Sequence, residues 1–66
     1  MQSPSRYTGR DLKAERVRAG LTQVELGSLI GVSGRRIANI ESQIRVAPQF
    51  AARIFDALAR VPADVA

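Results

Sequence analysis

The segment from Leu26 to Ser33 constrains the fold more than any other part of this 66-residue sequence. Two helices that cross steeply through a turn of three or four residues need a small residue where they touch, and Gly27 supplies it. They also need a residue at ease with positive φ in the turn, and Gly31 supplies that. Val32 can fill the gap between the helices. Apolar residues that would complete a shared core stand at positions 26, 29, 30, 37 and 40.

Local end signals predict four short helices in total. Gly20 offers the left-handed cap that ends a first helix. The run Thr22-Gln23-Val24-Glu25 has the pattern of a capping box at the start of a second. The expected first residues or caps of the four helices are Arg10, Thr22, Ser33 and Pro48. No stretch shows the period-two alternation of a strand, so the expected fold is all-α.

Apolar spacing assigns an inward face to each helix and divides the chain. The residues expected to face inward are Leu12, Val17, Leu26, Leu29, Ile30, Ile37, Ile40, Ala51, Ile54, Phe55 and Leu58, with Ala14 and Ala19 fitting the stripe of the first helix less well. Residues 1–9 contain Ser, Pro and Gly and predict a flexible N-terminal arm. Residues 10–61 are the predicted domain, and residues 62–66 a short C-terminal tail.

Composition narrows the classes of function. The formal net charge is +4 and the sequence pI is about 11.2, which favours a polyanionic partner, with nucleic acid before an acidic membrane surface. The chain has no cysteine and no histidine, so we expect no disulfide, no metal site and no cofactor. The carboxylates are few and scattered, which argues against an enzyme. No apolar run is long enough to span a membrane, and we expect a cytoplasmic protein.

One extended pattern resembles a known family. The residues Thr22-Gln23-x-x-Leu26-Gly27-x-x-Ile30-Gly31-Val32-Ser33-x-x-x-Ile37-x-x-Ile40-Glu41 are similar to the helix-turn-helix core of the Cro and cI-type repressors, also called the xenobiotic-response-element type. The resemblance covers about Arg10 to Arg60. It implies a compact bundle of four or five helices of the phage-repressor type. The second helix of that motif rests against the DNA backbone and the third enters the major groove, usually in a dimer.

The resemblance also implies roles for individual residues. The positions that match base-reading residues are Ser33, Gly34, Arg35 and Asn39. The expected phosphate contacts, with Arg36 open to either a phosphate or a base, are Thr22, Gln23, Arg36 and Arg45. Arg16 and Glu41 match an ion pair that ties the first helix to the end of the third. Chemically, Arg35 can bind guanine O6 and N7 in a bidentate manner, and Asn39 can do the same for adenine N6 and N7.

Three departures from the family pattern affect these expectations. Gly34 stands where relatives usually carry a polar side chain, so one base contact is missing or the backbone comes closer to the groove. Gln43 replaces a glycine that often closes the third helix. Residues 61–66 leave little room for a fifth helix, which puts the usual mode of dimerisation in doubt.

Two functional hypotheses follow. The first is a sequence-specific regulator of transcription, a repressor in its leading form, that binds double-stranded DNA as a homodimer on a partly palindromic site. The second is a protein-interaction module with the same fold, such as an antitoxin-like or regulatory segment. After the third helix, Ile44, Val46 and Phe50 could all be core residues, but a small bundle has limited interior and we expect at least one of them to be exposed. An exposed apolar cluster of these residues would serve as a dimer or partner surface.

Overall fold

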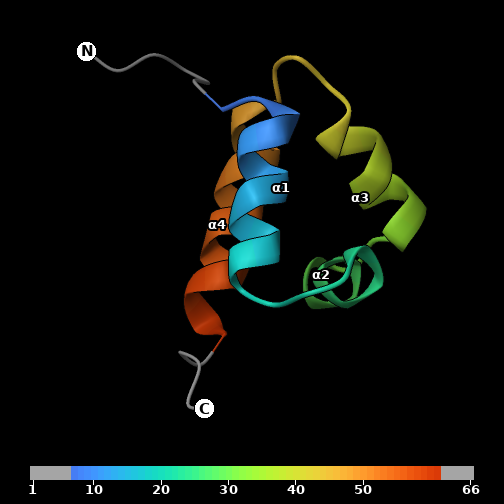
Figure 1. The fold of residues 1–66 in the computed structure, drawn as a ribbon, viewed down its shortest axis with the longest axis vertical. Helices are drawn as coiled ribbons and strands as arrows, with labels where there is room; N and C mark the ends of the chain where they lie inside the picture. The colour runs from blue at the N-terminus through green and yellow to red at the C-terminus, as the bar shows by residue number, and fades with distance from the viewer. Residues whose placement is uncertain (1–6, 62–66) are drawn as a thin grey trace.

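Four helices and no strand lie within residues 7–61, the part of the chain that the computed structural model describes. Their bounds are Gly9–Arg18 for α1, Gln23–Ile30 for α2, Gly34–Glu41 for α3 and Pro48–Arg60 for α4 (Figure 1). The expectation of an all-α fold is confirmed. None of the four helices is both long and apolar enough to cross a membrane.

The helix starts follow from side-chain caps. At α2 the Thr22 hydroxyl accepts the Glu25 N–H at 3.0 Å, and the Glu25 carboxylate accepts the Thr22 N–H at 2.8 Å, which is the predicted capping box. At α3 the Ser33 hydroxyl accepts the Arg36 N–H at 3.1 Å. Helix α4 has no side-chain cap and begins with Pro48, whose fixed φ suits the first helical turn. The predicted starts of these three helices are therefore confirmed.

The predicted N-terminal arm is wrong for its last three residues. A second capping box, formed by Thr8 and Asp11, starts α1 at Gly9. The Gly9 N–H donates to the Gln43 carbonyl at 2.8 Å, and the ring of Tyr7 lies 4.6 Å from that of Phe55. These contacts join residues 7–9 to both the α3–α4 loop and α4. The rest of the predicted arm, residues 1–6, and the predicted tail, residues 62–66, lie outside the described residues.

The core consists of one apolar cluster shared by all four helices. Its buried members are Leu12, Leu26, Ile30, Ile37, Ile40, Val46, Ala51, Ile54 and Ala57. Phe55 and Leu58 are half-buried against it. Three residues expected to face inward are on the surface instead: Ala14 is exposed, Val17 is 57% exposed and Leu29 is 52% exposed. Val17 and Leu29 each lie one residue, or about 100° of helix rotation, from the inward position that Arg16 or Ile30 occupies.

The helices are arranged as two pairs around this core. Helices α1 and α4 run alongside each other. Helix α2 is seen nearly end-on and α3 lies in the plane of the view, so α2 and α3 cross steeply (Figure 1). The turn between them depends on the two predicted glycines. Gly31 has φ +79°, and a Cβ on Gly27 would overlap the Val32 carbonyl oxygen. The Val32 N–H donates back to the Gly27 carbonyl at 2.8 Å, which fixes the direction in which α3 leaves the turn.

Candidate nucleic-acid interface

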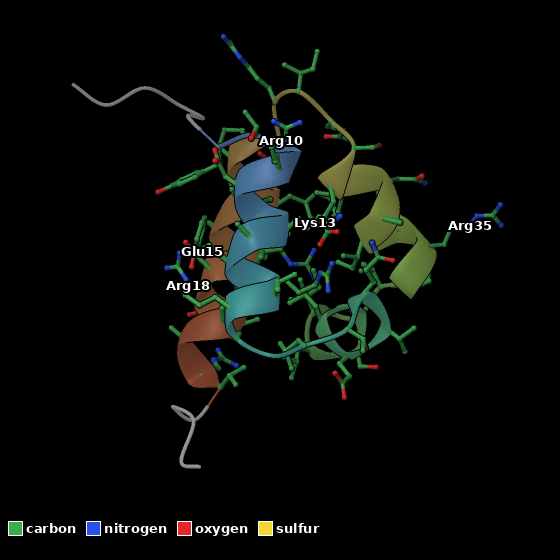
Figure 2. The ribbon with its side chains drawn as sticks, viewed as in Figure 1. Arg10, Lys13, Glu15, Arg18 and Arg35 are labelled. Atoms are coloured by element: carbon green, nitrogen blue, oxygen red, sulfur yellow. The ribbon has the colours of Figure 1, made fainter. Side chains whose placement is uncertain are left out.

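Helix α3 presents two polar residues, Arg35 and Asn39, on the side opposite the core. Ile37 and Ile40 are 0% and 1% exposed and set its inward face. At about 100° per residue, Arg35 lies about 200° from Ile37, and Asn39 lies only about 40° from Arg35. Both side chains are exposed, and Arg35 points away from the body of the molecule (Figure 2). The structure thus brings the two predicted base-reading residues onto one outward face.

The start of α3 lies against the start of α2. A Cβ on Gly34 would be 2.8 Å from the Val24 Cγ2 and 3.2 Å from the Val24 Cα. The missing side chain at this position therefore has a structural cause, because the space is filled by α2. Ser33 is exposed, but its hydroxyl oxygen already accepts the capping N–H of Arg36. Of the four predicted base-reading positions, Arg35 and Asn39 are those with extended polar groups on the surface.

A buried ion pair connects α1, α2 and α3. The Arg16 Nε and the Glu41 Oε2 are 2.6 Å apart, and the two side chains are only 10% and 5% exposed. The Arg16 Nη1 also donates to the Leu21 carbonyl at 2.7 Å, while the Gln23 Nε2 donates to the Glu41 Oε1 at 3.0 Å. This is the arginine–glutamate contact that the sequence predicts. It also holds the side chain of Gln23, a predicted phosphate contact, in place at the start of α2.

A second cluster at the α3–α4 contact was not expected from the sequence. The guanidinium carbon of Arg36 lies 5.0 Å from the centre of the Phe50 ring, and that of Arg53 lies 5.6 Å from the same centre. The Arg53 Nη2 also donates to the Ile30 carbonyl at 2.6 Å, at the end of α2. One sequence signal pointed toward this cluster. Arg36 directly precedes the inward Ile37, and this spacing places it on the flank of α3.

The loop between α3 and α4 divides the predicted dimer surface. Ile44 is 83% exposed, as a surface residue should be, and the neighbouring Arg45 is exposed as well. Val46 is 1% exposed and belongs to the core, and its N–H donates to the Tyr7 carbonyl at 3.1 Å. Phe50 is half-buried under the two guanidinium groups. Val46 is therefore wrong as a dimer-surface residue and is a core residue, which was the alternative prediction for it, so the three residues do not form one exposed apolar cluster.

A capped α2, a turn with a left-handed glycine and an α3 with an outward polar face define a small all-helical domain of the helix-turn-helix class. Comparison with protein families agrees, because residues 9–66 match the model of the helix-turn-helix domain. The chain belongs to this family, whose members typically bind DNA, most often to regulate transcription, and are typically not enzymes. The comparisons found no similar curated protein and no similar solved structure.

Proposed function

We propose that this protein is a sequence-specific regulator of transcription, acting as a repressor, that reads double-stranded DNA with α3. The observation that carries the proposal is the outward face of α3, where Arg35 and Asn39 are exposed on the side opposite the core. A helix of this kind fits the major groove, where arginine and asparagine distinguish guanine and adenine. Because a regulator of transcription must reach its DNA site, we propose a cytoplasmic location.

Phosphate contacts would position the domain on the duplex. The proposed contacts from the start of α2 and from the α3–α4 loop are Thr22, Gln23 and Arg45. The Thr22 hydroxyl accepts the Glu25 N–H, and the Gln23 amide donates to the Glu41 carboxylate, so both groups are ordered in the absence of DNA. A primary amide has two N–H donors, and the contact of Gln23 with Glu41 uses one of them. Ordered donors lose less conformational freedom on binding than free ones.

We further propose that two copies bind half-sites about one helical turn apart. The test is to incubate the purified protein with a pool of random duplexes at near-physiological salt and to sequence the retained DNA. Two related half-sites in the enriched motif would support the dimer and give its spacing. A single half-site would contradict the dimer but leave sequence-specific binding intact. Absence of any enriched motif, with the protein folded, would contradict the proposed function.

Replacing Arg35 by alanine is expected to relax the base preference at one position of the selected site. The lost bidentate contact accounts for about 1–3 kcal/mol of discrimination. The measurement is the same selection performed with the variant. Lys13→Ala is the matched control, because it removes one exposed positive charge from α1, away from Arg35 in Figure 2. An unchanged preference profile with Arg35→Ala would contradict the assignment of Arg35 to base readout.

A protein-interaction module is the second candidate, and two surface features favour it. Ile44 is 83% exposed at the α3–α4 loop. An open apolar groove between α2 and the end of α4 contains Leu21, Val24, Leu29 and Val61. If binding to DNA disappears as salt rises and shows no sequence preference, the interaction module becomes the better explanation.

A further inference from the structure

We propose that Phe50 is a positioning residue that holds the guanidinium of Arg36 on the flank of α3, ready to bind a DNA phosphate. The inference rests on the proposed function and deepens it. It assigns Arg36 to phosphate binding and not to base readout. It also adds a residue of α4 to the machinery that binds the duplex.

The direction of Arg36 separates it from the base-reading face. Arg36 lies about 100° from both Arg35 and Ile37 around the helix axis, and so between the outward face and the core. Its guanidinium carbon lies 5.0 Å from the centre of the Phe50 ring, on the side of α3 that faces α4. When a helix lies in the major groove, the base edges face its outermost side and the phosphates line its flanks. The geometry therefore points Arg36 at the backbone.

The donors of Arg36 are available for a ligand. A guanidinium carries five N–H donors and suits a phosphate oxygen pair. Among residues 7–61, Arg36 has no acidic partner and no side-chain hydrogen bond, and its contact with Phe50 is with an aromatic ring that offers no oxygen or nitrogen acceptor. The contact thus holds the side chain in place and leaves N–H donors for a phosphate.

Arg53 fixes the other contact of the ring. Its Nη2 is tied to the Ile30 carbonyl at 2.6 Å, and its guanidinium carbon lies 5.6 Å from the ring centre. Phe50 therefore lies against one anchored cation and one cation with free donors. Two positive charges near one ring raise the local potential and attract a polyanion. Because Arg36 is already held, it loses less freedom when it binds a phosphate.

The test compares affinities for the duplex selected by the wild-type protein and for a scrambled duplex, over a range of salt concentrations. Phe50→Leu keeps an apolar side chain but removes the ring, and is expected to weaken binding to both duplexes about 2- to 5-fold. Phe50→Tyr keeps the ring and should bind as the wild type does. Phe55→Leu is the matched control on the same helix, because its ring contacts Tyr7 and no arginine. Melting curves verify that each variant is folded.

Arg36→Ala tests the same site from the other side and, because the side chain is exposed, without a risk to folding. It is expected to make the negative slope of log K against log salt about 0.9 shallower, the value for one phosphate contact, and to leave the base preference unchanged. The double variant, which combines Arg36→Ala with Phe50→Leu, should bind no more weakly than Arg36→Ala alone.

Three outcomes would overturn the inference. The first is that Phe50→Leu binds both duplexes as well as Phe55→Leu does. The second is that the affinity losses of the two single variants multiply in the double variant, and the third is that Arg36→Ala changes the base preference. Each leaves the proposed function standing, whereas a wild-type protein that enriches no duplex in the selection overturns both.

Discussion

Replacing Glu41 by alanine is expected to destabilise this domain by about 3–5 kcal/mol, because it leaves the Arg16 guanidinium buried without its counter-charge. Arg16 is only 8% exposed, so the charge cannot be rehydrated unless the contact between α1 and α3 opens. A single core of this size supplies roughly 3–5 kcal/mol of net stability. The variant should therefore be largely unfolded at room temperature. Urea unfolding followed by circular dichroism measures the loss.

A paired substitution distinguishes a buried charge from a merely lost contact. Replacing Arg16 by methionine together with Glu41 by leucine removes both charges and keeps apolar volume, so it should recover part of the loss. Recovery will be incomplete, because the Leu21 carbonyl and the Gln23 amide each lose a partner at a cost of about 1–2 kcal/mol.

The exposed pair of Arg60 and Asp56 serves as the control, with side chains 75% and 67% exposed. Asp56→Ala should change the stability by less than about 1 kcal/mol. If Glu41→Ala costs no more than this control, the buried pair has no structural role.

The buried pair of Arg16 and Glu41 also explains why one part of the fold was not predicted from the sequence. The starts of α2 and α3 were predictable from local chemistry, because the signals of a cap lie within four residues of each other, as at Thr22 and Glu25. The start of α1 has the same kind of signal at Thr8 and Asp11, but Thr8 was assigned to the N-terminal arm. The inward face of α1 was not predictable from apolar spacing, since a charged residue occupies it. Arg16 follows Leu12 at a helical spacing of four, so Val17 is rotated to the surface. Apolar spacing alone cannot find an inward arginine, and only the family resemblance, which pairs Arg16 with Glu41, indicated this contact.

The candidate site shows a similar division. The outward placement of Arg35 and Asn39 follows from the positions of Ile37 and Ile40 within one helix, and the structure agrees with it. Contacts between distant segments had no sequence signal of this kind. Val46 lies in a loop without periodicity, and it is buried because its N–H binds the carbonyl of Tyr7, 39 residues earlier. The stack of Arg36 on Phe50 likewise depends on how α3 and α4 meet.

Replacing Gly27 by valine is expected to cost at least about 3 kcal/mol and to abolish binding to the selected duplex. A Cβ at this position would overlap the Val32 carbonyl oxygen and lie 3.0 Å from the Ser33 carbonyl carbon. These are backbone atoms of the turn, so they cannot move aside as a flexible side chain can. The turn itself must shift, and α3 with its reading face moves with it. Thermal unfolding and duplex binding measure the two effects.

Ser28→Val is the matched control, because it places the same β-branched residue on the next, exposed position of α2. It should cost less than about 1 kcal/mol, which reflects helix propensity alone. Gly27→Ala should fall between the two, since one methyl group requires a smaller displacement of the turn. A graded loss from alanine to valine at position 27, with Ser28→Val close to the wild type, would show that close backbone contact sets the angle between α2 and α3. Equal losses at positions 27 and 28 would mean that the turn tolerates a side chain, and Gly27 would then be dispensable for presenting Arg35.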